Sequence, residues 1–236
     1  MTKIISVTGH EILDSRGNPT VGATVTLDDG ATASAAVPSG ASTGSREAVE
    51  LRDEDPKRFG GKGVLKAVSA VNRQLAKAVI GLDAINQQRI DQVLVETDGT
   101  PNKSRFGANA ILAISLATLR AVAVSSSREM FEHISELAGN QSPTELPVPM
   151  FNVLNGGAHA MGSTDFQEFM LVPAGMNSFS EALQCGVEMY QWLNKRLHAD
   201  GHATTVGDEG GFAPQGLTTV SYTHLRAHET SLHLVC

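Results

Sequence analysis

The stretch Thr20-Val21-Gly22-Ala23-Thr24-Val25-Thr26-Leu27, followed by Asp28-Asp29-Gly30, decides the fold of the first half of this sequence. Its β-branched threonines and valines are typical of a β-strand. Asp28-Asp29-Gly30 is a turn signal, so we expect residues 31–37 to return as the next strand until Pro38 ends it. The first forty residues are therefore predicted to be β-structure.

The hydrophobic period changes after the loop that follows Pro38. Apolar residues recur at three- and four-residue steps within residues 64–79, which predicts an amphipathic helix. Residues 90–94 indicate another helix, and residues 108–124 indicate a well-buried one. Strands followed by helices predict an α+β domain, a three-stranded antiparallel sheet with helices, over residues 1–140.

The composition shifts near residue 140. Pro143, Pro147 and Pro149 lie close together, which is typical of a linker. We therefore place a domain boundary there and assign residues 141–218 to a second domain.

The second domain alternates strands and turns before its first helix. We expect a strand at 150–154, a strand at 166–172, a helix from Ser178 and a short strand before Gly207. Ser178 and Glu181 have the spacing of a capping box, in which both side chains satisfy free backbone N–H groups at the start of the helix.

The bulk composition argues against some classes of function. The net charge of −7 is unlike a general nucleic-acid binder, because phosphate backbones need a basic surface. Cys185 and Cys236 make no disulfide framework, so a reducing cytosol fits best. The first residues contain no secretory signal, and the most apolar stretch, residues 110–119, is too short to span a membrane and is expected to be a buried helix.

Two loops in the first domain carry polar motifs. Residues 14–21 join two strands, and taken alone they are a polar structural turn. The small-residue loop from Ser39 to Gly44 has the composition of a lid that excludes water from a site, and its serines offer oxygen ligands to Mg²⁺. Taken alone, this loop is better explained as a flexible linker.

Polar residues lie beside strands at three places in the second domain. They are Asn155-Gly156-Gly157-Ala158-His159, Gln167-Glu168 and Gly207-Asp208-Glu209-Gly210-Gly211. If the strands share one sheet or barrel, these groups meet at one edge, where barrel enzymes place their chemistry. Each residue alone is more often solvated surface. The glycines around Glu209 favour a functional turn, because glycine is entropically costly to order.

Six motifs occur in order along the chain: DSRGNPTV at 14–21, PSGASTGSREA at 38–48, NKSRFGANAILA at 102–113, NGGAHA at 155–160, DFQEFMLVP at 165–173 and GDEGGFAP at 207–214. Together they closely resemble enolase, from about Lys3 to Pro214. The resemblance implies that residues 141–218 begin an enolase-type α/β (TIM-like) barrel. It also implies a cytoplasmic lyase that uses Mg²⁺ to dehydrate 2-phosphoglycerate reversibly to phosphoenolpyruvate in glycolysis, and a full-length homodimer.

The resemblance also implies roles for individual residues. Glu209 resembles the general acid that protonates the departing hydroxyl, and Glu168 resembles the carboxylate that supports it. Gln167 and His159 are similar to substrate-binding residues. Ser39 resembles the serine that ligates the second Mg²⁺ when the lid closes.

This sequence departs from the family pattern in two respects. The loop at 160–164 differs from the Asp- and Asn-containing form that is common in the family. The lysine base and the main Mg²⁺ ligands belong to later barrel strands, and a complete barrel needs about 250 residues. We therefore expect an incomplete barrel in these 236 residues, and the alternative function is a catalytically inactive fragment.

The last residues, 219–236, do not match the family pattern and are interpreted as a non-family tail. His224 and His228 have a spacing that also occurs in zinc sites, but the sequence nearby does not complete such a site. An unrelated α+β binding module is the remaining alternative for the whole chain.

Overall fold

The computed structural model describes residues 2–40, 44–140, 145–157, 160, 162–207 and 209–216. The chain divides into two compact units, Met1–Pro143 and Thr144–Cys236, and each is described by itself. His159 and the proposed tail at 219–236 lie outside the described residues.

A three-stranded antiparallel sheet forms the base of the first unit, as the sequence predicted. Its strands are β1 (Ile4–Leu13), β2 (Pro19–Leu27) and β3 (Thr32–Ala36), in the order β1-β2-β3. The polar turn between β1 and β2 is closed by a hydrogen bond of 2.8 Å from the Asp14 N–H to the Asn18 carbonyl. Gly17 has a φ of 77° there, which glycine adopts without steric cost.

The helices of the first unit follow the sheet in sequence. They are η1 (Phe59–Gly61), α1 (Leu65–Ala70), η2 (Val71–Leu75), α2 (Ala76–Val79), α3 (Gln87–Asp98), α4 (Ala108–Ser125) and α5 (Met130–Leu137). The single helix expected at 64–79 forms as α1, a π-helical turn at η2, and α2. The sequence did not predict α5. Gly99 ends α3 with a φ of 71°, a left-handed conformation that suits glycine at a helix C-terminus.

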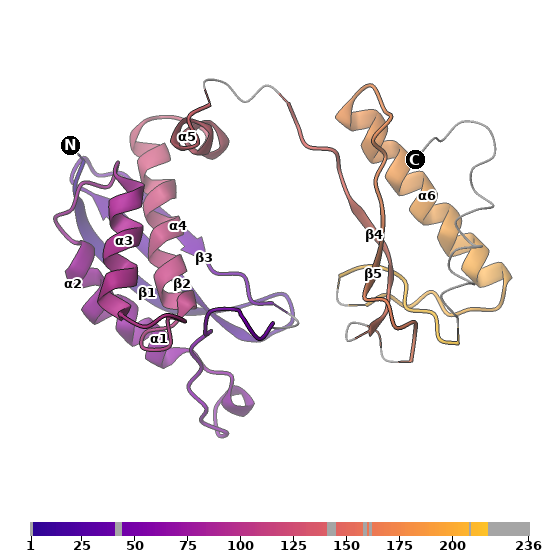
Figure 1. Cartoon of the computed structure of the whole chain (residues 1–236), viewed down its shortest axis with the longest axis horizontal. Helices are drawn as coiled ribbons and strands as arrows, with labels where there is room; N and C mark the ends of the chain where they lie inside the picture. The colour runs from indigo at the N-terminus through magenta and orange to yellow at the C-terminus, as the bar shows by residue number, and fades with distance from the viewer. Residues whose placement is uncertain are drawn as a thin grey trace. The chain divides into compact units, whose positions relative to one another are not determined.

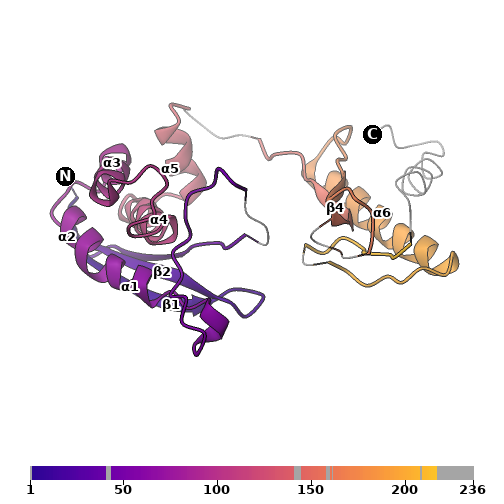
Figure 2. The same ribbon diagram turned by 60° about the horizontal axis from the view of Figure 1, so that its bottom comes forward.

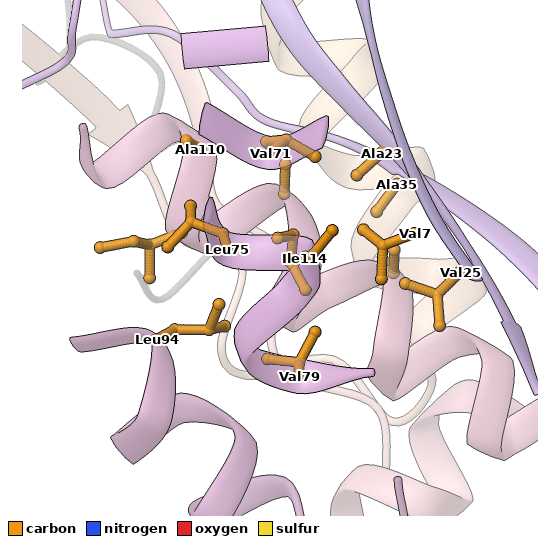
Figure 3. Packing of buried hydrophobic residues seen from close by; sticks show 14 of the residues in the cluster. Val7, Ala23, Val25, Ala35, Val71, Leu75, Val79, Leu94, Ala110 and Ile114 are labelled. Carbon is orange, nitrogen blue, oxygen red and sulfur yellow. The ribbon is translucent and has the colours of Figure 1, made fainter. Parts of the chain in front are cut away.

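One face of the sheet packs against the helices. Figures 1 and 2 show α1 to α4 over a single face of the sheet, and α4 runs along β2 and β3. In Figure 3, Val7 and Val25 of the sheet lie near Val79 and Ile114 of the helices. This buried cluster extends through Leu75 and Leu94, so apolar burial joins sheet and helices into one core.

Helix α4 lies within one residue of the buried helix predicted at 108–124 and extends beyond its most apolar part, residues 110–119. Its 18 residues have the length and composition of a membrane-spanning helix, with a mean hydropathy of 1.6, but 56% of that window is buried within the protein. Buried side chains along its length include Ala110, Ile114, Ala117 and Ala121. A helix of this kind is a core helix of the α+β unit, as expected.

An ion-pair network fixes the segment between η1 and α1. The two terminal nitrogens of Arg58 donate to the Glu11 carboxylate, which also accepts the Val64 N–H at 3.1 Å. Asp53 accepts the N–H groups of Leu65 and Lys66, both at 2.8 Å, and so caps the start of α1. The Arg58 guanidinium, foremost, and the Val64 N–H hold the pKa of Glu11 below its usual value, against the effect of burial.

We expect Glu11→Gln to lower stability near neutral pH and to lower it less in acid. The folded-state pKa of Glu11 lies below its ordinary value of 4.5, so its contribution is present above that pH and is lost as the pH falls through the folded value. Thermal unfolding at neutral pH and at about pH 3 measures the difference. Glu96→Gln, at an exposed carboxylate, is the control. Equal losses for Glu11→Gln at both pH values would contradict this assignment.

The second unit contains a two-stranded sheet and one long helix. Strand β4 (Phe151–Asn155) pairs antiparallel with β5 (Glu168–Leu171), and Phe212 adds a parallel bridge to Leu154. Helix α6 (Phe179–Ala199) lies beside these strands in Figure 1. Both strands lie within two residues of their predicted bounds.

The predicted helix start at Ser178 is confirmed, with one change in its cap. The Ser178 Oγ accepts the Glu181 N–H at 3.2 Å, as in a capping box. The Glu181 carboxylate, however, accepts the N–H of Asn177 at 3.0 Å rather than that of Ser178. The glutamate still satisfies a free N–H group at the start of the helix.

Candidate functional site

Glu209 lies in a tight glycine turn of the second unit. The turn is closed by hydrogen bonds from the Gly207 N–H to the Gly211 carbonyl at 2.8 Å and from the Gly210 N–H to the Gly207 carbonyl at 3.1 Å. Gly210 has a φ of 85°, which explains glycine at this position. The exposed Glu209 side chain is thus carried on a backbone of defined shape.

Backbone hydrogen bonds attach the end of this turn to strand β4. The Phe212 N–H donates to the Val153 carbonyl, and the Asn155 N–H donates to the Phe212 carbonyl, both at 2.9 Å. Leu154, between these partners, is fully buried, and Phe212 is almost fully buried. The turn therefore has a fixed position relative to β4.

Asn152 of β4 contacts the carboxylate of Glu209 directly. Its side-chain Nδ2 donates to Glu209 Oε2 at 3.2 Å. A Cβ at Gly211 would lie 2.6 Å from Asn152 Oδ1, the same distance from Asn155 Oδ1, and 3.0 Å from the Leu154 nitrogen. Only glycine at 211 allows the two asparagine side chains to approach the turn this closely.

Tyr190 of α6 supports the turn from the helix. Its hydroxyl donates to the Gly210 carbonyl at 2.8 Å, and its ring stacks on Phe212 with centroids 4.4 Å apart. Burial raises the pKa of Tyr190, which keeps the hydroxyl protonated as a donor.

The Glu168 side chain, at the start of β5, projects from the face of the sheet that carries the Asn155 side chain. It pairs with Asn155 across the two strands, and paired residues project from one face of an antiparallel sheet. Asn155 faces Gly211 on that side. The structure therefore brings Glu168 and the Glu209 turn to one face of the sheet.

Gln167 precedes β5 and is exposed. Its carbonyl accepts the Gly156 N–H at 2.9 Å. A Cβ at Gly156 would lie 2.2 Å from the Phe166 carbonyl oxygen, so glycine is needed where the two segments meet. The glycine motif after β4 and the strand with Glu168 are thus held together, whereas His159 lies outside the described residues.

Asn152 and Tyr190 were not identified from the sequence, and Asn155 was noted only as the first residue of a glycine motif. The signal was present in the strand Phe151-Asn152-Val153-Leu154-Asn155, where two asparagines interrupt an otherwise apolar strand. Amides in such a strand need partners, and this favours a polar site at its surface.

Ser39 belongs to the first unit and is held by charged neighbours. Its Oγ donates to Glu50 Oε2 at 3.2 Å and accepts from Arg52 Nη2 at 3.1 Å. Arg16 donates to the Ser39 carbonyl at 2.8 Å, which links the two polar loops of this unit. Arg16 is thus a structural residue that the sequence identified only as part of a turn.

These neighbours have opposite effects on a cation at Ser39. The Arg52 guanidinium opposes a cation beside the serine oxygen, whereas the Glu50 carboxylate is the kind of oxygen ligand that Mg²⁺ takes. Within the part of the chain that the structure describes, there is no cluster of three His, Cys, Asp or Glu side chains that could hold a metal ion. The described residues alone therefore do not form the metal centre that the resemblance implies.

Each of the two units matches the model of a known protein-family domain. Residues 4–134 match the model of the enolase N-terminal domain, and residues 143–224 match that of the enolase C-terminal TIM barrel domain. The N-terminal match covers the sheet and helices α1 to α4, and the barrel match covers β4, β5, α6 and the Glu209 turn. The chain therefore belongs to the enolase family.

Proposed function

We propose that this sequence belongs to a phosphopyruvate hydratase, which reversibly dehydrates 2-phosphoglycerate to phosphoenolpyruvate in glycolysis. The observation that carries the proposal is the Glu209 carboxyl group, held on a closed turn by Asn152 and on the same face of the sheet as Glu168. A positioned carboxylic acid can protonate a departing hydroxyl, which is otherwise a poor leaving group.

The reaction divides into two chemical tasks. A proton must leave C2, next to the substrate carboxylate, and the hydroxyl must leave C3. We assign Glu209 to the second task as general acid, with Glu168 supporting it and with Gln167 and His159 binding substrate. These roles rest on the family resemblance together with the position of Glu209 and Glu168.

The first task needs groups beyond the described site. Lys195 of α6 is the only lysine in residues 144–236, and it is exposed. The family resemblance places the lysine base and the main Mg²⁺ ligands in later barrel strands. This observation favours a second candidate, in which the 236-residue chain by itself is catalytically inactive. A cytoplasmic location, Mg²⁺ dependence and homodimerisation of the complete protein are proposed with the enzyme.

A coupled assay with 2-phosphoglycerate and Mg²⁺ tests both candidates. One sample is the 236-residue chain, and the other is a chimera that joins residues 1–216 to the remaining barrel of an enolase. We expect phosphoenolpyruvate from the chimera, abolished by EDTA, and none from the 236-residue chain. A folded but inactive chimera would contradict the proposed enzyme, and turnover by the 236-residue chain would contradict the second candidate.

A further inference from the structure

We infer that Asn152 is a positioning residue for the Glu209 carboxyl group. The inference rests on the proposed function, because the carboxyl group that Asn152 orients is the proposed acid. It is based on the hydrogen bond of 3.2 Å from Asn152 Nδ2 to Glu209 Oε2 and on how the asparagine amide is itself held.

The position of the Asn152 amide is defined by the backbone around it. Its Oδ1 is buried and lies 2.6 Å from the point where a Cβ of Gly211 would stand. Asn152 also belongs to β4, where it pairs with Met170 of β5. The strand fixes the base of the side chain and Gly211 gives its oxygen room, so Nδ2 is directed at the Glu209 carboxylate.

Asn155 extends this polar surface beneath the turn. Its side chain is fully buried, and neither its Oδ1 nor its Nδ2 has a hydrogen-bond partner among the described residues. A buried amide without partners is unfavourable, and proteins keep such groups mainly where function requires them. Asn152 and Asn155 both place their amide oxygens beside Gly211, so the two side chains line the same side of the turn.

The main chain and the side chain of Glu209 are held by different residues. Tyr190 donates a hydrogen bond to the Gly210 carbonyl, and the Phe212 backbone is hydrogen-bonded to β4. The backbone of the turn should therefore keep its position when the Asn152 side chain is replaced. The Asn152 hydrogen bond, in contrast, reaches the Glu209 side chain at its carboxylate. Loss of the Asn152 donor should therefore disturb the orientation of the carboxyl group more than the fold.

Nuclear magnetic resonance of the 236-residue chain tests the contact without any activity. We expect the side-chain amide protons of Asn152 to shift when the Glu209 carboxyl group is protonated in acid. The same resonances should lose that response in Glu209→Gln, which has no ionisable group at this position. An Asn152 amide that ignores pH, or that responds equally in Glu209→Gln, would overturn the inference.

Kinetics of the chimera test the consequence. Asn152→Leu removes the donor, and Asn152→Asp replaces it with a carboxylate of the same shape. We expect each to lower kcat about 10- to 100-fold, the range of one hydrogen bond to a charged group, while KM changes far less. The control is Asn194→Asp, at a half-buried asparagine of α6 with no hydrogen bond to the described part of the turn.

The two proposals fail in different ways. An unsubstituted chimera that folds but makes no phosphoenolpyruvate refutes the enzyme assignment, and the resonance experiment still decides whether Asn152 orients Glu209. An active chimera whose kcat is unchanged by Asn152→Leu refutes the positioning role and leaves the enzyme assignment intact. A purely structural role for Asn152 would lower the folded yield of the variants without changing the kcat of the folded fraction.

Discussion

Glu209→Gln in the chimera is expected to lower the rate of dehydration by about 10²- to 10⁴-fold, the usual contribution of a general acid or base. Glutamine has nearly the same shape as glutamic acid and can still contact Asn152, but it has no acidic proton to give to the departing hydroxyl. Substrate binding should persist, because Glu209 is assigned to the leaving group. Steady-state kinetics with 2-phosphoglycerate measure the change.

Glu188→Gln is the matched control for this substitution. Glu188 is an exposed glutamate of α6, and its carboxylate accepts a hydrogen bond from the Gln184 side chain at 2.7 Å. It should leave kcat unchanged. An unchanged rate in Glu209→Gln would show that the acid is another group.

Leu154→Ala is expected to destabilise the second unit by about 2–5 kcal/mol. Leu154 is fully buried, and it belongs to the apolar cluster formed by β4, β5, α6 and Phe212. Its removal leaves a cavity under the bridge between β4 and Phe212, to which the Glu209 turn is attached. Chemical denaturation followed by the fluorescence of Trp192, the only tryptophan, reports on this unit.

The control for this prediction is Val187→Ala. Val187 is an exposed residue of α6, at 47% of its accessible surface, and such substitutions usually change stability by less than about 0.5 kcal/mol. If Leu154→Ala were as mild as Val187→Ala, the cluster beneath the turn would not be the core of this unit.

Local sequence patterns predicted much of the fold. The β-branched residues of β2 and the Asp28-Asp29-Gly30 turn indicated the sheet, and the apolar run of α4 indicated its central helix. The strand, turn and helix signals can be read from the sequence because each depends only on residues that are close together in the chain. Helix α5 is short and is capped by a glutamate, Glu129, so its capping box lacks the serine or threonine that marks a helix start.

The candidate site was only partly predictable for a related reason. Glycines around Glu209 signal a special turn in the sequence itself. The support of that turn comes from Asn152, which is 57 residues away, and from Tyr190 of α6. Such contacts form only when separate elements pack together, so the composition or periodicity of one segment cannot predict them. The contact of Arg52 with Ser39 likewise depends on folding, because the two residues are 13 positions apart in the sequence.

The central claim is that Glu209 acts on the departing hydroxyl and not on the proton at C2. Exchange of the C2 hydrogen of 2-phosphoglycerate with deuterated water, measured in the Glu209→Gln chimera, tests this claim most directly. We predict that exchange continues while phosphoenolpyruvate formation is lost, as expected for a reaction in which the proton is removed before the hydroxyl leaves. Loss of exchange in parallel with dehydration, in a folded variant that still binds substrate, would contradict the assignment.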